Sequence, residues 1–429
     1  MAPPARALLH ELYRVAVAAA HPSTCLPPLL PPPPDGRLLV LAAGKAAGSM
    51  AETAEAFYLD QHKLPRERLT GLAVARHGYA RPTRAVEMVE AGHPIPDAAG
   101  LAAASRALKL AESAGDRDLV LVLMSGGASA NWIAPAEGVS FADKQAVTRA
   151  LLRSGAVIGE INCVRKHLSR IKGGRLAQHA YPARLATIAI SDVPHDDPSA
   201  IGSGPTVPDP TTLADARAIV AKYRLDLPAS VTRALNEPKN ESPKPGDKIF
   251  ANTSFALAAR PADSQHAAEK AVRAAGYECV SLGDQVEGEA REVAVAQAKV
   301  VRSLRAQGKR AVILSGGELT VTVRGNGRGG PNQEYALALA IELAGMRGIA
   351  AISADTDGTD GGSGGPNDPA GAIVSGDTVA RAEAAGLDPA AFLADNDSTG
   401  FFAALKDLLL TGPTYTNVND FRAIIVDTV

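Results

Sequence analysis

A glycine–lysine pair, Gly44 and Lys45, stands between an apolar run and a helix-like segment in LLVLAAGKAAGSMAE, residues 38–52. The pair is typical of a phosphate site, because glycine lets the backbone approach a ligand and the ammonium adds a mobile positive charge. The stretch is not a P-loop, since Leu39 holds the place of the first glycine of that motif and Ala46 follows the lysine. A helix N-terminus beside Lys45 would favour an anion. The alternative is a lysine that only extends its ammonium into water at a strand end.

Two S-G-G segments follow other apolar runs. One is MSGGASANW, with Ser125, Gly126 and Gly127, and the other is LSGGE, with Gly316, Gly317 and then Glu318. Glycines at a strand end let backbone N–H groups surround an anion, so the segments indicate phosphate-binding loops. An ordinary tight turn between a strand and a helix would use the same residues.

Carboxylates cluster in ISDVPHDDPSAIGSGPTVPDPTT, directly after another apolar run. Asp192 and Asp197 stand in a proline-rich loop that continues to Ser203 and Gly204. Carboxylates held in this way suit Mg²⁺ binding or general-base catalysis. Local turns capped by aspartate side chains are the alternative.

The stretch TVTVRGNGRGGPNQEYALAL contains a G-x-G-x-x-G pattern, formed by Gly325, Gly327 and Gly330. The pattern imitates a dinucleotide-binding turn. However, the preceding residues alternate apolar and polar like a half-exposed antiparallel strand, whereas that turn follows a buried parallel one. Arg324 and Arg328 crowd the loop, which fits the binding of phosphate groups. Downstream, ADTDGTDGG places Asp355 and Asp360 in a glycine-rich loop suited to Mg²⁺ or a hydroxyl group, without the EF-hand spacing.

Basic residues gather in INCVRKHLSRIKGGRLA, residues 161–177; they are Arg165, Lys166, His167, Arg170, Lys172 and Arg175. Such a run usually forms a solvated helix face. It can also face a polyanionic ligand.

Elements that could position these residues alternate along the chain. Five short apolar runs read as strands buried on both faces, in RLLVLAAGK, DLVLVLMSGG, LATIAISD, RAVILSGGE and IAAISADTDG. Helical patterns lie between them, one with Asp97 as its N-cap and others near residues 288–308 and 332–345. The alternation predicts an α/β fold with a mainly parallel sheet, with ligands outside the carboxyl ends of the strands. A polar segment with three prolines, residues 235–248, predicts a linker or long loop.

Composition restricts the function classes. The chain has 429 residues, of which 46% are hydrophobic and 21% charged, and its net charge is −2. We therefore expect a globular protein of two or three domains that binds neither nucleic acid nor an anionic membrane. Three distant cysteines, no long apolar span and no secretory signal predict a reduced, cytoplasmic protein. The helix-like segment RALLHELYRVAVAAA is expected to pack on the N-terminal domain.

Eight segments, taken together and in order, resemble the class II glycerate kinases over nearly the whole chain. They are GKAAGSMAE, AGHPIPD, MSGGASA, INCVRKHLSRIKGGRLA, SDVPHDDPSAIGSGPTVPDPTT, SGGELTVTVRGNGRGG, DTDGTDG and TGPTYTNVNDFRAIIV. The resemblance implies an N-terminal Rossmann-like α/β/α sandwich, residues 1–236. It also implies a C-terminal mixed α/β MOFRL domain, residues 237–429, with the active site in the cleft. The implied activity is phosphorylation of D-glycerate to 2-phosphoglycerate with ATP and Mg²⁺. Members are often labelled hydroxypyruvate reductases, so an NAD(P)H-dependent reductase is the alternative; a homodimer is left open.

The resemblance also assigns roles to residues by motif. Lys45, Arg324 and Asp192 are expected to be catalytic. The residues expected to bind nucleotide or phosphate are Ser125, Gly126, Gly127, Ser203, Gly204, Gly316, Gly317, Gly325, Gly327 and Arg328. Glu318, Asp355 and Asp197 are expected to bind the metal, and Asn332 and Asp360 the substrate. Three positions depart from the family pattern, where His195 and Tyr415 replace glycines and Pro331 replaces an arginine.

Overall fold

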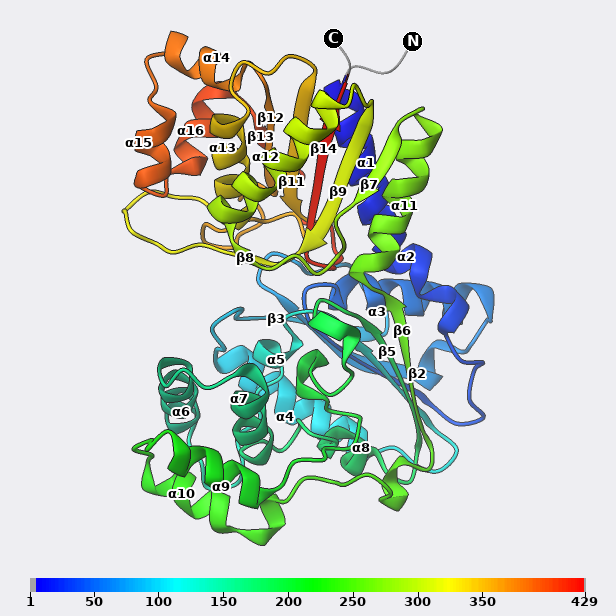
Figure 1. Ribbon diagram of the computed structural model, residues 1–429. Helices are drawn as coiled ribbons and strands as arrows, with labels where there is room; N and C mark the ends of the chain where they lie inside the picture. The colour runs from blue at the N-terminus through cyan, green and yellow to red at the C-terminus, as the bar shows by residue number, and fades with distance from the viewer. Residues whose placement is uncertain (1–4, 428–429) are drawn as a thin grey trace. The chain divides into compact units, whose positions relative to one another are not determined.

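The computed structural model describes residues 5–427, which form two compact units (Figure 1). One unit consists of residues 26–258, and the other joins residues 5–25 to residues 259–427. This division differs from the predicted domains, 1–236 and 237–429, because the N-terminal helix packs with the C-terminal part of the chain. The proline-rich segment at residues 235–248 is no linker. It packs within the 26–258 unit, where Asn240 and Ser242 are buried.

The 26–258 unit is built on a six-stranded sheet in the order β3-β2-β1-β4-β5-β6. Its strands are β1 (Leu38–Ala43), β2 (Leu69–Arg76), β3 (Val86–Ala91), β4 (Leu119–Met124), β5 (Arg184–Ile190) and β6 (Thr253–Ala259). The pairs from β3 to β5 are all parallel. This is the strand order of a Rossmann fold, and its switch point lies between β1 and β4. Every residue of β1 and β4 is buried, which explains their uninterrupted apolar sequence.

The helices of this unit are α3 (Ala47–Glu55), α4 (Ala98–Glu112), α5 (Ala128–Asn131), α6 (Phe141–Arg153), α7 (Ile158–His167), α8 (Arg175–Ala180), α9 (Leu213–Lys222) and α10 (Ala229–Asn236). Of these, α6, α7, α9 and α10 pack against one another in a buried cluster of their own. Asp97 begins α4 as predicted, since its carboxylate accepts from Gly100 N–H at 2.9 Å. Residues of α4 and α8 share a buried cluster with Leu39 and Leu41 of β1. They therefore cover one face of the sheet.

The 259–427 unit contains a six-stranded sheet in the order β13-β12-β11-β14-β9-β7. Its strands are β7 (Glu278–Ser281), β9 (Ala311–Gly317), β11 (Ile349–Asp355), β12 (Gly371–Ser375), β13 (Leu408–Leu409) and β14 (Asp420–Val426), and a separate pair joins β8 (Gly288–Glu289) to β10 (Leu319–Thr320). The expected mainly parallel sheet is wrong for this unit. Here β14 lies between β9 and β11 and is antiparallel to both.

Helices line both faces of this second sheet: α1 (Ala5–Ala20), α11 (Pro261–Ala274), α12 (Ala290–Ala306), α13 (Pro331–Glu342), α14 (Thr378–Ala384), α15 (Pro389–Ala394) and α16 (Ser398–Leu405). The short helix α2 (Pro22–Cys25) follows α1. One buried cluster joins α1 and α11 to the sheet through residues such as Leu12, Val272 and Ile425. Another joins α12 and α13 through Val301 and Leu339. The unit is a mixed α/β sandwich, and together the two units confirm the α/β fold class.

Candidate active site

Lys45 and the first glycine loop lie at the switch point of the 26–258 sheet. Lys45 follows β1, and its N–H donates to the carbonyl of Gly126 at 2.8 Å. Ala46 N–H donates to Ser125 Oγ at 2.9 Å, so the ends of β1 and β4 are joined directly. Gly44 has φ of 117°, and a Cβ there would lie 2.4 Å from Ser125 Oγ. The glycine of the Gly44–Lys45 pair is therefore required by close packing.

A cavity of about 290 Å³ opens beside this loop. Its lining includes Gly126, Gly127, Asp192, His93 and Arg165. Within the described residues 5–427, the N–H groups of Gly126 and Gly127 have no hydrogen-bond acceptor. The structure thus brings a predicted glycine loop and the predicted aspartate together at the carboxyl edge of the sheet, where α/β proteins bind ligands.

His93 was missed as a site residue in the sequence, although it stands in the quoted AGHPIPD string. A Cβ on Gly127 would lie 2.8 Å from His93 Cδ2 and 3.5 Å from Lys45 Cγ, so the two side chains flank this glycine. A lone histidine in a loop carries no spacing signal. Its place became evident only in the folded chain, where the parallel strands β3 and β4 end at the same edge of the sheet.

Ser203 and Gly204, predicted to bind phosphate, are both buried. Ser203 is buried, and its hydroxyl is 2.8 Å from that of Ser129, which lines the cavity. Gly204 has φ of 58°, and a Cβ there would meet Ser199 Cα at 3.0 Å. Asp197 is exposed and caps a turn, with one carboxylate oxygen accepting from Ser199 N–H at 2.8 Å and the other from its hydroxyl at 2.9 Å. The turn interpretation therefore fits Asp197 better than metal binding does.

The basic run does not form a solvated helix face. It spans the end of α7, a turn and the start of α8, and four of its members are buried: Lys166, His167, Lys172 and Arg175. Buried charges need partners. Lys166 pairs with Asp209 at 3.5 Å, while Lys172 donates to the carbonyl of Ser129 at 2.9 Å. The run thus supports the loops around the cavity.

In the 259–427 unit, β9, β14 and β11 bring three predicted segments to one edge of the sheet. Asp420, the first residue of β14, pairs with Gly317 on one side and Asp355 on the other. Glu318 is exposed directly after β9, and Asp355 is partly buried at the end of β11. Two of the three predicted metal-binding carboxylates therefore emerge at the same sheet edge.

A buried polar network lies beneath this edge. Asp360 accepts from the N–H groups of Asn332 and Gln333 at 3.0 and 2.8 Å, and Asn332 Nδ2 donates to Asp420 at 2.6 Å. Arg422 Nη1 donates to Asp420 Oδ2 at 2.8 Å. Burial, reinforced by the charge of Asp420, raises the pKa of Asp360 to about 7. Asn332 and Asp360 are 1% and 3% exposed, and their hydrogen bonds hold α13 against the sheet. Their contact with substrate stays a prediction.

The G-x-G-x-x-G loop is anchored within its own unit. Arg324 and Gly325 N–H groups donate to Asn396 Oδ1 at 2.7 and 3.0 Å, and Gly327 N–H donates to the carbonyl of Asp395 at 2.9 Å. A Cβ on Gly325 would lie 2.3 Å from the Asp395 oxygens. These glycines therefore serve close packing, and their N–H groups are occupied. The expected alternating strand is only the two residues of β10, which pairs in parallel with β8.

The second S-G-G segment is packed in a similar way. Gly316 N–H donates to the carbonyl of Gly283 at 2.9 Å. A Cβ on Gly317, whose φ is 104°, would lie 2.3 Å from the backbone of Val286. The geometry accounts for both glycines through packing, without a phosphate. In contrast, the side chains of Arg324 and Arg328 are exposed.

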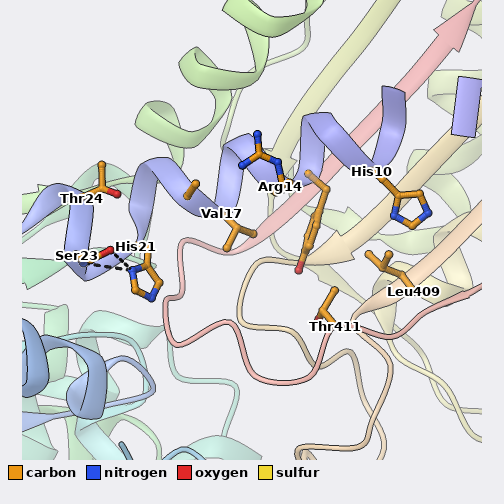
Figure 2. Close-up of a pocket in the computed structure, with 10 residues that line it drawn as sticks. His10, Arg14, Val17, His21, Ser23, Thr24, Leu409 and Thr411 are labelled. Atoms are coloured by element: carbon orange, nitrogen blue, oxygen red, sulfur yellow. Dashed lines mark hydrogen bonds between the residues drawn. The ribbon is translucent and has the colours of Figure 1, made fainter. Parts of the chain in front are cut away.

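A further cavity of about 520 Å³ runs along α1 in the 259–427 unit (Figure 2). His10, Arg14, Val17 and Leu409 contribute to its lining, and His21 Nδ1 is 2.7 Å from Ser23 Oγ at one end. It contains no predicted site residue. Its lining residue Tyr13 donates its hydroxyl to the carbonyl of Asp355 at 2.8 Å, which fixes the end of β11.

The described part of the chain contains neither a cluster of potential metal ligands nor a membrane-spanning helix. Across residues 5–427, no three histidine, cysteine, aspartate or glutamate side chains group closely enough for a metal ion. In the same residues, no helix is both long and apolar enough to cross a membrane.

Comparison with known proteins agrees with this arrangement. The model of a domain of unknown function, DUF4147, matches residues 8–236, and the MOFRL family model matches residues 311–420. A relative from Agrobacterium vitis that carries the provisional name hydroxypyruvate reductase is 46% identical over 98% of this chain and 94% of its own length. D-glycerate 2-kinase from Thermotoga maritima is 37% identical over 96% of this chain and 95% of its own length.

Solved structures also show similarity to a glycerate kinase. A crystal structure of glycerate kinase from Thermotoga maritima matches with a TM-score of 0.86 and 36% identity, covering 98% of this chain and 99% of that one. Relatives named glycerate kinase extend to Homo sapiens, at 34% identity over 97% of this chain. The chain therefore belongs to the family of glycerate kinases that combine a DUF4147 domain with a MOFRL domain.

Proposed function

We propose that the protein transfers the γ-phosphoryl group of ATP to D-glycerate, gives 2-phosphoglycerate and requires Mg²⁺. One observation carries the proposal: Lys45, the Gly126–Gly127 loop and Asp192 gather at the switch point of a Rossmann-ordered sheet. Phosphoryl transfer depends mostly on positioning and on neutralising charge, and this edge offers both. Family membership supports glycerate as the acceptor.

The residues of the 26–258 unit have distinct proposed tasks. The Lys45 ammonium neutralises charge on the transferring phosphoryl group. The N–H groups of Gly126 and Gly127 bind phosphate oxygens, as backbone amides at strand ends do elsewhere. Asp192 orients the attacking hydroxyl group and accepts its proton. His93, beside Gly127, completes the wall of the cavity.

From the 259–427 unit, we assign Arg324 to the transferring phosphoryl group and Arg328 to binding alone. Glu318 and Asp355 are the candidates for Mg²⁺, because carboxylate oxygens suit this cation and both residues emerge where β9 and β11 end. When bound, Mg²⁺ would neutralise negative charge on the phosphate oxygens. Asp197 is left out of this set, because both of its oxygens are engaged in a turn.

The test is ADP release in a coupled assay with MgATP and D-glycerate, followed by identification of the phosphoglycerate isomer. We expect ADP release to depend on both D-glycerate and Mg²⁺, and the product to be the 2-phospho isomer. Turnover of hydroxypyruvate with NADH, in the absence of any ADP release, would contradict the proposal.

The provisional name hydroxypyruvate reductase of the Agrobacterium vitis relative makes hydride transfer the second candidate. It is less well supported by the geometry. The G-x-G-x-x-G loop follows the two-residue strand β10, and two of its glycine N–H groups are occupied. The turn after β1, where a dinucleotide fingerprint belongs in this strand order, reads Gly44–Lys45.

A further inference from the structure

A second cavity of the 26–258 unit, about 350 Å³ in volume, lies next to the cavity beside Gly126 and Gly127, which we call the glycine-loop cavity. Its charged lining residues are all basic: Lys144 and Arg149 from α6, Arg165 from α7, and Lys172 from the turn before α8. No acidic residue belongs to its lining. We call this the basic cavity.

Two of these cations are held inside the protein by neutral groups. Lys144 Nζ donates to the carbonyls of Arg165 and Leu168 at 2.8 and 3.0 Å, and Lys172 Nζ donates to that of Ser129 at 2.9 Å. Both lysines are at most 2% exposed. Burial, reinforced by the nearby charge of Arg165, lowers the pKa of each lysine well below its usual range. An anion in the basic cavity would relieve this accumulation of positive charge.

Arg165 connects the basic cavity to the glycine-loop cavity, because it lines both, as do Pro94, Ser129 and Ala130. Its one side-chain hydrogen bond within residues 5–427 is a long one, 3.4 Å to Asn162. Burial lowers the pKa of this guanidinium, although it stays charged. A guanidinium presents paired N–H donors that match the two oxygens of a carboxylate.

We propose that the basic cavity binds the carboxylate of the hydroxy-acid acceptor, with Arg165 as the residue that recognises it. The inference rests on the proposed function and specifies how the acceptor is oriented in the site. An acid whose hydroxyl group lies between the glycine loop and Asp192 has its carboxylate only a few bonds away. Arg165 is the cation that faces both cavities.

Steady-state kinetics of Arg165→Gln test this assignment. We expect KM for D-glycerate to rise about tenfold or more, which is the scale of one lost charge-assisted contact, with KM for ATP unchanged. The matched control is Arg170→Gln, from the same basic run but exposed and outside both cavity linings, which should keep both constants. A rise in KM for ATP alone would assign the basic cavity to a phosphate and overturn the proposal.

Calorimetry on the unaltered protein needs no variant. D-glycerate should bind without nucleotide, whereas glycerol, which lacks the carboxylate, should not, and inorganic phosphate should compete only weakly. Binding of glycerol as tight as that of glycerate would overturn the inference.

The two proposals fail separately. If no ADP is released with any hydroxy acid while glycerate still binds through Arg165, the proposed kinase activity is wrong and the carboxylate site stands. If ADP is released and Arg165→Gln keeps the KM of the unaltered protein for glycerate, the carboxylate site is wrong and the kinase activity stands.

Discussion

At the scale of single residues, the candidate site depends on side chains whose backbone is fixed by other groups. Lys45 is held through its own N–H and through the bond from Ala46 to Ser125. The backbone of Arg324 is held by Asn396. In both cases the chain is fixed at the α-carbon, which is the preorganisation that transition-state stabilisation requires.

Lys45→Ala should lower kcat by about 100-fold, because a positioned charge partner of the transition state is lost. Lys45→Arg should restore activity only in part, since the planar guanidinium of arginine differs in shape from the compact ammonium of lysine. The measurement is steady-state kinetics, with thermal unfolding as the check on folding. Lys109→Ala, an exposed position on α4, is the control. Normal turnover of a folded Lys45→Ala protein would return Lys45 to the role of a solvated lysine.

The two arginines of the glycine-rich loop should separate kinetically. Arg324→Ala is expected to lower kcat and kcat/KM together, as loss of a transition-state contact does, and Arg328→Ala to raise KM with little change in kcat. Both side chains are exposed, so neither change should cost much stability. A larger loss of kcat in Arg328→Ala than in Arg324→Ala would reverse the two assignments.

Asp360 should give the protein a distinctive dependence on pH. Burial raises its pKa to about 7, above its ordinary value of 3.8. Between these values the folded protein binds a proton that the unfolded chain releases, so this group makes stability fall as pH rises. We expect Asp360→Asn to flatten the fall in Tm between about pH 4 and pH 7. The exposed control Asp116→Asn should keep the slope, and equal slopes in all three proteins would contradict the assignment.

At the scale of elements, strand ends position the candidate site, and the sequence predicted most of these ends. The apolar runs before Lys45, Ser125, Asp192, Gly316 and Asp355 are β1, β4, β5, β9 and β11. Uninterrupted apolar runs identify strands buried on both faces. The position of β14 between β9 and β11 was not predictable in this way, because strand neighbours depend on contacts far apart in the chain.

The glycine-rich loops also depend on contacts between residues far apart in the chain, which the sequence does not reveal. The sequence marked the loops rich in glycine, and it connected the G-x-G-x-x-G loop with phosphate binding and the S-G-G segments with phosphate binding or an ordinary turn. Gly325 and Gly327 instead pack against residues 395–397, a contact that no local pattern reveals. The buried basic run is a comparable case, since clustered charges normally face water and only the folded chain supplies carbonyls such as that of Ser129.

Two glycines with positive φ allow packing to be separated from backbone strain. Gly44→Ala places a Cβ 2.4 Å from Ser125 Oγ, whereas Gly155→Ala, at φ of 76°, meets nothing within 4 Å. Both changes carry the strain of the left-handed region, about 1 kcal/mol. Gly44→Ala should lose clearly more stability in urea unfolding and most kinase activity. Equal losses would show that the β1–β4 junction tolerates the extra carbon atom.

At the scale of the whole molecule, the chain order and the spatial order differ. Residues 26–258 form one unit, while α1 belongs with residues 259–427. The sequence predicted α1 as a helix but placed it on the wrong neighbour, because an apolar face does not identify the surface that covers it. Leu9 and Leu12 of α1 pack in a cluster with Val312 and Ile425, and Ser264 donates its hydroxyl to the carbonyl of Ala16 at 2.7 Å.

This arrangement has a consequence for synthesis on the ribosome. Helix α1 emerges early, yet its buried partners include Ile425 of β14, near the far end of the chain. The 26–258 unit can complete its sheet during translation, while the apolar face of α1 waits for strands that do not yet exist. A message truncated before β14 would therefore yield a chain with one finished unit and an uncovered apolar helix, which is the kind of surface that chaperones and proteases recognise.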